Sequence, residues 1–531
     1  MLRRNFKMKI ISSVLCLLLL SLVLSGCSGS TTTTTKTTNT NVATASNEFD
    51  SEDMDSSWNE KDASVITLSG DSISLDGSGA TVSGTTVTIL TGGVYVIKGT
   101  LDDGQIIVDS DAKTTVRLVL DGVSITDSDN APIYVKNAEK TIITLAEGTS
   151  NTLTDGQTYT LADGEDEPSA ALFSKDDLTI NGTGKLTVNG NYNHAIKSKD
   201  DIKIVSGNIT VTAVQDAINA GDNAYINDGT LVINAGDDGI HSDGVLTFYK
   251  GTITVESSNE AIEAANITIN DGTFHLAAKD DGINTAGGTD TDTATDGRMD
   301  NFNANDDSKL NINGGYIYID AQGDGIDVNG ACVMTDGTVI VNGPTNNGNG
   351  ALDYNGSFTI KGGILIAAGS SGMAQAPDNN STQPSLKLNL GNQSAGTLVN
   401  IQNADGESIL TFAPTKTYAS VVFSSPELQD GATYTVYTGG SSTGTATDGL
   451  YQDGEYTGGT QITTITVDGA VTAYGQSGNT QGGPGGGQGG PGGQGGGPGG
   501  RQGGPGGGQG GPGNAQGSTG NVPGDSGGGN T

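Results

Sequence analysis

The sequence is poor in basic residues and in aromatic residues, and each shortage excludes a class of protein. Only 24 Lys and Arg stand against 60 Asp and Glu, so the formal net charge is −36. This balance argues against a nucleic-acid partner, because phosphate binding needs a basic patch. Aromatic residues make up 5% of the chain, so a wide aromatic stacking platform is not expected.

Cysteine is also scarce, and the 3 cysteines leave no pair for a disulfide in a folded domain. Cys16 lies in an apolar run at 10–24 that follows a basic start, the pattern of a targeting segment. Residues 24–27, Leu-Ser-Gly-Cys, resemble a bacterial lipobox, with an ordinary signal peptide or a membrane helix as alternatives. We therefore expect Cys27 to carry a lipid that holds a monomer on the extracellular face of the cell membrane. Cys332 is expected to be a buried apolar thiol.

A pattern of four residues recurs between residues 193 and 353: polar, Ala or Gly, Ile or Leu, polar. Its aliphatic member falls on Ile196, Ile218, Ile240, Ile262, Ile283, Ile326 and Leu352. The steps between these positions are 22, 22, 22, 21, 43 and 26 residues. A second marker is a glycine before an alternating strand. It recurs with the same period at Gly207, Gly229, Gly251, Gly272, Gly315, Gly337 and Gly363. Two independent markers with one period predict a repeat architecture.

The repeat unit is predicted to be β. Each unit holds two or three short alternating runs between Asp, Asn and Gly clusters, and none offers a long amphipathic helix. A unit of about 22 residues matches one coil of a parallel β-helix, which would stack the aliphatic residues inward. A β-sandwich or a propeller is the alternative, although a propeller blade needs about 40 residues or more.

Composition divides the chain into six parts. They are a signal peptide at 1–26, a Ser/Thr-rich tether at 27–47, an N-terminal β cap with the first coils at 48–169, regular coils at 170–367 with an insertion at 285–307, a C-terminal β region at 368–475, and a Gly/Pro/Gln-rich tail at 476–531. The tail is predicted to be disordered because it cannot bury a core.

Acidic residues recur at the predicted corners of the coils and are the main chemical signal. One column contains Asp216, Asp238, Glu260, Asp281 and Asp324, with Asp237 and Asp280 beside it, and a second column three residues on contains Asn219, Asn284, Asp327 and Asp353. Unit charges about 5 Å apart repel by roughly 1 kcal/mol even in water, so such a ladder is costly without a cation. Calcium takes six to eight oxygen ligands and fits this density, although Asp and Asn are also ordinary turn formers.

Histidine gives no comparable signal. His194, His241 and His275 lie on different predicted coils and lack the spacing of a metal site, so the sequence does not predict zinc. Three tyrosines, Tyr316, Tyr318 and Tyr354, are candidates for single sugar contacts, with strand or core packing as the alternative for each.

Several strings make residues 48–475 similar to the bacterial carbohydrate-binding domain-containing β-helix family. They are residues 94–101, 199–202, 281–284, 348–354, 370–377 and 424–428. The resemblance implies a right-handed parallel β-helix like that of pectate lyases, which binds calcium and attaches to plant polysaccharides such as cellulose or polygalacturonate. The family's ligand residues are not carried over, because the positions do not match one by one.

Three functions remain open from the sequence. The first is non-catalytic binding of a plant-type polysaccharide by a calcium-containing surface lipoprotein. The second is a calcium-dependent polysaccharide lyase, which needs a base to take a proton from the sugar. The candidate bases are Lys197, Lys199, Lys279 and Arg298, but spacing singles out none of them, so no catalytic residue is assigned. The third is a surface adhesin or spacer without sugar specificity.

Overall fold

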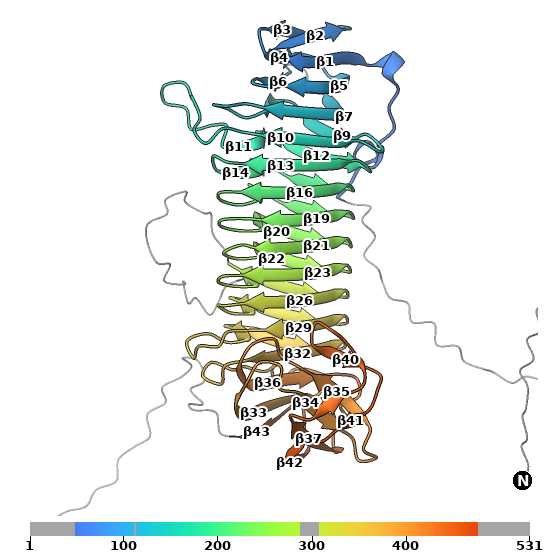
Figure 1. Cartoon of the computed structure of the whole chain (residues 1–531), viewed down its shortest axis with the longest axis vertical. Coiled ribbons are helices and arrows are strands. Elements are labelled where there is room, and N and C mark those ends of the chain that lie inside the picture. Colours follow the sequence, from blue (N-terminus) through green and yellow to red (C-terminus); the bar gives the residue numbers. More distant parts are fainter. Residues whose placement is uncertain (1–47, 111–112, 287–306, 476–531) are drawn as a thin grey trace, which may run out of the picture. The chain divides into compact units, whose positions relative to one another are not determined.

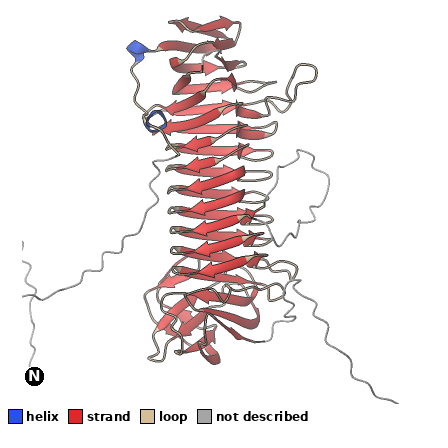
Figure 2. Cartoon of the chain, turned by 180° about the vertical axis from the view of Figure 1, so that it is seen from behind, coloured by secondary structure: helices blue, strands red, loops and turns tan. Residues whose placement is uncertain are grey.

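Short strands stacked in a column dominate the structure (Figure 1). The computed structural model describes residues 48–110, 113–286 and 307–475. The predictions for the signal peptide, Cys27, the tether, most of the insertion and the tail therefore lie outside the described residues. Two short helices, α1 (Ser51–Met54) and η1 (Glu60–Asp62), precede the first strand, and strands form almost all the remaining regular structure (Figure 2). No helix within the described ranges is long and apolar enough to cross a membrane.

Most strands pair in parallel with their equivalents one coil away, and the pairings form three ladders. The first ladder contains β1 (Ser64–Gly70), β5 (Gly93–Leu101), β7 (Thr115–Thr126), β10 (Ser150–Thr154), β13 (Lys185–Gly190), β16 (Asn208–Ala213), β19 (Thr230–Asn234), β21 (Thr252–Ser257), β23 (Thr273–Ala278), β26 (Tyr316–Ala321), β29 (Thr338–Asn342) and β32 (Ile364–Gly369).

The second ladder begins one corner further along each coil. It contains β4 (Thr86–Ile89), β6 (Gln105–Asp109), β8 (Ile133–Asn137), β11 (Ala170–Ser174), β14 (His194–Ser198), β17 (Ile218–Ala220), the first halves of β20 (Ile240–Phe248) and β22 (Ile262–Ile269), β24 (Ile283–Thr285), β27 (Ile326–Val328) and β30 (Leu352–Tyr354).

The third ladder starts on the first halves of β1, β5 and β7 and completes each coil. It continues with β9 (Lys140–Leu145), β12 (Asp177–Gly182), β15 (Ile202–Ile204), β18 (Ala224–Ile226), the second halves of β20 and β22, β25 (Lys309–Ile312), β28 (Ala331–Met334) and β31 (Ser357–Ile360). Parallel pairing thus extends back to β1, so the part predicted as a cap with first coils belongs to the same column.

The core is the inward aliphatic stack that the repeat predicted. Along the second ladder, Ile196 pairs with Ile218, Ile218 with Ile240, Ile240 with Ile262, and Ile262 with Ile283. All five side chains are 0% exposed, which confirms the predicted burial in register. Burial of such a side chain contributes about 1.5–3 kcal/mol, so this stack helps to hold each coil to the next. Cys332 is also fully buried in the core, as predicted.

The recurring glycine, which is the second marker in the sequence, is explained by its backbone conformation. The seven marker glycines all have positive φ, from +85° at Gly363 to +130° at Gly207. A side chain rarely tolerates this region, whereas glycine enters it without a steric penalty. The glycine therefore recurs because every coil makes the same turn into its first-ladder strand.

The ends of the column are antiparallel. At the N-terminal end, β2 (Ser72–Asp76) and β3 (Ala80–Ser83) form hairpins with β1 and β4. At the C-terminal end, β36 (Tyr418–Ser424) pairs antiparallel with both β32 and β33 (Ser385–Gln393), and β43 (Val471–Tyr474) joins β33 in parallel. A second antiparallel sheet follows, in the order β39 (Thr445–Thr447), β40 (Leu450–Gln452), β35 (Ser408–Phe412), β34 (Val399–Gln402), β37 (Thr433–Thr438), β42 (Thr460–Thr466).

Candidate functional site

The acidic residues of the first predicted column lie at the corner between the first and second ladders. Backbone hydrogen bonds hold this corner from coil to coil: the amide of Ala217 donates to the carbonyl of Asp238, and that of Gly282 donates to the carbonyl of Asp324. Glycine at a corner can have a steric reason, since a Cβ at Gly325 would collide with the side chain of Val341. The backbone thus fixes a carboxylate at the same corner of successive coils.

The first part of the acidic column is buried, and its carboxylate pairs with neighbouring side chains. Asp216 is 3% exposed; its Oδ2 lies 3.3 Å from Nδ1 of His194 and accepts a hydrogen bond from the Asn219 amide at 2.6 Å. Burial opposes ionisation of Asp216, but the hydrogen bond and the charge of His194 outweigh it and lower the pKa to about 2. Asp216 is therefore already satisfied by protein groups.

The middle of the column gathers a histidine and three carboxyl groups. Asp238, His241 and Glu263 are at most 2% exposed, and they present ligand atoms that all lie within 4.8 Å of one another. Glu260 interacts with both Asp238 and Glu263; burial and then these two negative charges raise the pKa of Glu260 to about 12. Burial is also the first cause that raises the pKa of Asp238 well above its ordinary value.

The last part of the column is an all-oxygen cluster. Asp281, Asp324 and Asp327 are half-buried and present ligand atoms within 4.8 Å of one another. Burial, followed by the negative charges of Asp324 and Asp280, raises the pKa of Asp281 to about 8. The fold therefore concentrates negative charge at this corner.

The donors of this cluster fit a calcium ion. Asn284 pairs in register with Asp327, it is 8% exposed, and its Oδ1 is buried without a hydrogen-bond donor among the described residues. A neutral amide oxygen beside three carboxylates is the hard-oxygen set that Ca²⁺ prefers. Asp281, Asp324, Asp327 and Asn284 would hold the ion, and the pairing of β24 with β27 brings them together.

The remaining predicted ligands are dispersed around these clusters. Asp237 is half-buried and Asp280 is exposed. Asp353 pairs in register with Asp327 and accepts a hydrogen bond from the side chain of Gln375. His241 and Glu263 were not predicted as ligands, although their alignment in the second column was a usable signal.

The chain is similar in sequence to known carbohydrate-binding domain-containing proteins. A family model described as "Carbohydrate-binding domain-containing protein" matches residues 83–341, which span β4 to β29 and most of the acidic column. Over these residues the chain belongs to this carbohydrate-binding domain-containing family. A curated relative in the family, from Acetivibrio thermocellus, is 42% identical over 150 residues, which are 28% of this chain and 52% of that protein. The chain thus spans about half the length of the curated relative it matches.

One solved structure is also similar to this family member. It is described as the polysaccharide lyase-like protein from C. thermocellum, in a gadolinium derivative. The sequence identity is 32%, and the match covers 56% of this chain and 96% of that chain with a TM-score of 0.36.

The three candidate tyrosines of this chain pack against other parts of the same chain. Tyr316 and Tyr318 contact the core of the C-terminal β region, and the hydroxyl of Tyr316 donates to Asp448 Oδ2 at 2.8 Å. The hydroxyl of Tyr354 donates to the carbonyl of Ala376 at 2.9 Å. Each side chain is half-buried, so one ring edge at most is open to a sugar.

Two of the candidate bases, Lys199 and Lys197, contact other side chains than those of the Asp281, Asp324 and Asp327 cluster. Lys199 Nζ lies 2.5 Å from the carboxylate of Glu167, and Lys197 Nζ lies 3.2 Å from His194 Nε2. Lys197 belongs to β14, which is four ladder steps, or about 19 Å, from β24. Lys279 is exposed, and Arg298 lies outside the described residues.

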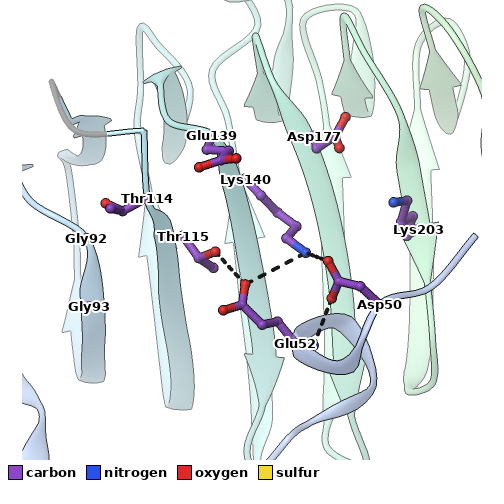
Figure 3. A pocket seen from close by; sticks show the side chains of 10 residues that line it. All are labelled: Asp50, Glu52, Gly92, Gly93, Thr114, Thr115, Glu139, Lys140, Asp177 and Lys203. Carbon is purple, nitrogen blue, oxygen red and sulfur yellow. Dashed lines mark hydrogen bonds and ion pairs between the residues drawn. The ribbon is translucent and has the colours of Figure 1, made fainter.

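A second candidate site lies on the third ladder. A cavity of about 740 Å³ opens beside the N-terminal segment 48–62, and its lining includes Asp50, Glu52, Lys140, Asp177 and Lys203 (Figure 3). None of the acidic-column residues lines it. Its charged groups have mixed sign, and Lys140 is already paired, so the cavity shows no preference for an anion or a cation.

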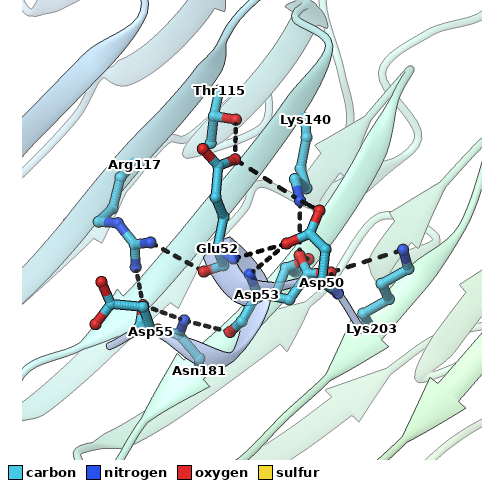
Figure 4. Close-up of polar contacts among 10 residues, drawn as sticks. Asp50, Glu52, Asp53, Asp55, Thr115, Arg117, Lys140, Asn181 and Lys203 are labelled. Atoms are coloured by element: carbon cyan, nitrogen blue, oxygen red, sulfur yellow. Dashed lines mark hydrogen bonds and ion pairs between the residues drawn. The ribbon is translucent and has the colours of Figure 1, made fainter. Parts of the chain in front are cut away.

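The N-terminal segment beside this cavity is bound tightly to the third ladder (Figure 4). Arg117 donates to the backbone carbonyls of Glu52 and Asp55, at 3.0 Å and 2.7 Å. Asn181 donates to the carbonyl of Asp53 at 2.8 Å. The acidic segment before β1 is therefore folded against coils far along the chain.

Proposed function

We propose that the protein is a non-catalytic, cell-surface polysaccharide-binding lipoprotein that uses calcium at the acidic column. The observation that carries the proposal is the cluster of Asp281, Asp324 and Asp327 within a segment that belongs to a carbohydrate-binding domain-containing family. The ligand is a plant-type polysaccharide, either polygalacturonate or cellulose.

The architecture in this proposal is a right-handed parallel β-helix with about 22 residues per coil, the step that dominates the repeat. Register pairs such as Ile196 with Ile218 and Ile218 with Ile240 support that coil length. The insertion at 285–307 would leave the coil between β24 and β25.

Charge gives calcium its role in this proposal. A protein with a net charge of −36 repels a polyuronate, so direct contact between column and sugar carboxylates is unfavourable. A bound calcium ion would supply the positive charge that bridges the two sets of carboxylates. Asp281, Asp324 and Asp327 are half-buried and so leave room for a sugar ligand, whereas Asp216 and Asp238 are buried.

Tyr316, Tyr318 and Tyr354 would add single contacts at most. The hydroxyls of Tyr316 and Tyr354 already donate to protein acceptors, which leaves ring edges as the sugar-contacting parts. Affinity would therefore depend mainly on the calcium bridge, and binding of neutral cellulose would be weaker than binding of polygalacturonate.

The anchoring part of the proposal is a lipid on Cys27 and a tether at 28–47, which hold the domain on the extracellular face of the membrane. Labelled palmitate should enter the wild-type chain and should not enter Cys27→Ala. Equal labelling of the two chains would refute the anchor without affecting the binding proposal.

The alternative function is a calcium-dependent polysaccharide lyase. Lys197 and Lys199 contact His194 and Glu167 rather than the calcium cluster, which favours the non-catalytic function. Affinity electrophoresis on a panel of polysaccharides, with and without EDTA, tests the proposal. Retardation by polygalacturonate that EDTA abolishes supports it, and no retardation by any polysaccharide refutes it. Appearance of unsaturated uronate absorbance would establish the lyase instead.

A further inference from the structure

The middle of the acidic column differs from the calcium cluster because it contains a nitrogen donor. His241 Nδ1 lies 3.1 Å from Asp238 Oδ2 and 3.8 Å from Glu263 Oε2. The three residues come from two consecutive corners of the second ladder, where His241 pairs in register with Glu263. One nitrogen and two carboxylate oxygens therefore converge on a single point.

The separations between these donors suit a small metal ion. Zinc lies about 2.1 Å from histidine nitrogen and carboxylate oxygen, so two ligands at a tetrahedral angle are about 3.4 Å apart. The observed separations of 3.1 Å and 3.8 Å fall on either side of that value. Glu260 interacts with Asp238 and Glu263 and so lies beside the three donors.

The second ring nitrogen of His241 has the partner that metal-binding histidines usually have. Its Nε2 lies 3.0 Å from Asp243 Oδ1. A carboxylate on the far nitrogen fixes the orientation of a ligating imidazole and makes it a stronger donor. Asp243 thus orients Nδ1 toward Asp238 and Glu263.

Burial and charge indicate that protein groups alone do not balance this cluster. Asp238 is 2% exposed, and among the described residues no hydrogen-bond donor reaches its Oδ1. One imidazolium would carry a single positive charge against the carboxyl groups of Asp238, Glu260 and Glu263. A buried carboxylate without compensation costs several kcal/mol, whereas a dication matches this set better.

We propose that Asp238, His241 and Glu263 form a buried site for a first-row transition-metal dication, separate from the calcium cluster. Imidazole nitrogen favours zinc and its neighbours over calcium, which prefers oxygen donors alone. The metal ties two consecutive coils together in the middle of the column. The proposal does not depend on polysaccharide binding.

Zinc is the probe that tests this site. Because each ligand side chain is at most 2% exposed, the ion is expected to enter during folding, so the full chain should be expressed in zinc-supplemented cells. Metal analysis after dialysis against excess Ca²⁺ should find one zinc per chain. His241→Gln should lose that zinc, whereas His275→Gln, on a half-exposed residue that contacts Asp448, should keep it.

Two further measurements complete the test. The Asp324→Asn variant should keep the zinc, because its residue belongs to the calcium cluster. X-ray absorption of the zinc-loaded wild type should show one nitrogen and two or more oxygens around the ion, a result that does not require any variant to fold. Absence of zinc, its displacement by Ca²⁺, or its retention in a folded His241→Gln chain would overturn the proposal.

Discussion

The carboxylate of Asp53, which has no exposed surface, lies 3.0 Å from the ammonium group of Lys140 on β9. Thr179 on β12 donates to the same carboxylate at 2.7 Å. The pair therefore fixes the N-terminal segment to two coils of the third ladder. Nearby, Phe49 packs edge-on against the rings of Tyr225 and Tyr249, which extends the attachment to β18 and the end of β20.

Lys140→Met should destabilise the fold by about 3 kcal/mol, because it leaves the buried carboxylate of Asp53 without its closest cation. Urea unfolding measures the change. Lys250→Met is the matched control, since it removes an exposed pair in which Nζ lies 2.7 Å from Asp228, and its effect should stay within about 1 kcal/mol. Equal effects of the two substitutions would mean that the N-terminal segment contributes little to stability.

Glu167 joins two consecutive coils, because its carboxylate lies 2.7 Å from Lys175 Nζ and 2.5 Å from Lys199 Nζ. Burial opposes its ionisation, but the hydrogen bonds and charges of the two lysines outweigh burial and lower the pKa of Glu167. A lowered pKa adds stability above the unfolded value of about 4.3, and this stability is lost as pH falls through the native pKa.

Glu167→Gln should therefore be less stable than wild type at pH 7, and the difference should disappear in acid, below the native pKa. Urea unfolding across a pH series measures it. Glu427→Gln, at an exposed position outside the column, should show no such pH-dependent difference. A constant difference between Glu167→Gln and wild type at every pH would rule out the ion pairs as its cause.

The stacked core gives a third prediction. Ile240→Ala removes a side chain that is 0% exposed between Ile218 and Ile262, and should cost about 2–5 kcal/mol in the free energy of unfolding. Val214→Ala, at a side chain that is 52% exposed, should change stability by about 0.5 kcal/mol or less. A small loss for Ile240→Ala would contradict a core built on this stack.

The repeat in the sequence predicted the stacked strands. The same repeat explains why the side-chain partners could not be predicted. Residues equivalent to Ile240 and Gly251 recur once per coil, because each position has the same structural role in every coil. Alignment also placed Asp281, Asp324 and Asp327 on neighbouring columns. It did not reveal that His241 points at Asp238 and Glu263, because periodicity fixes position along a ladder and leaves the side-chain partners undetermined.

Contacts outside the repeat were not predictable. Asp53 meets Thr179, a partner 126 residues away, and no periodic signal connects them. The same holds for Tyr316 and Asp448, where a loop of the C-terminal β region covers a strand of the first ladder. Both contacts arise because non-repeating segments fold back on the column.

Calcium gives a fourth prediction, which concerns stability alone. An ion bound only by the folded chain adds about 2.7 kcal/mol when its concentration is 100 times the dissociation constant, so EDTA should lower Tm. Asp324→Asn should reduce this Ca²⁺-dependent increase in Tm. Asp336→Asn, at an exposed turn residue whose carboxylate accepts a hydrogen bond from the amide of Gly337, should keep it. Identical melting curves with Ca²⁺ and with EDTA would identify the acidic columns as ordinary turns.

The most direct test of the account is calorimetric titration of polygalacturonate into the full chain, in Ca²⁺ and in EDTA. Saturable binding is expected in Ca²⁺, with loss of binding in EDTA and at least a tenfold weaker affinity for Asp281→Asn or Asp324→Asn, which corresponds to about 1.4 kcal/mol. Asp336→Asn should bind like wild type. Binding of equal strength in EDTA, or unchanged binding by both cluster variants, would contradict a calcium bridge at Asp281 and Asp324.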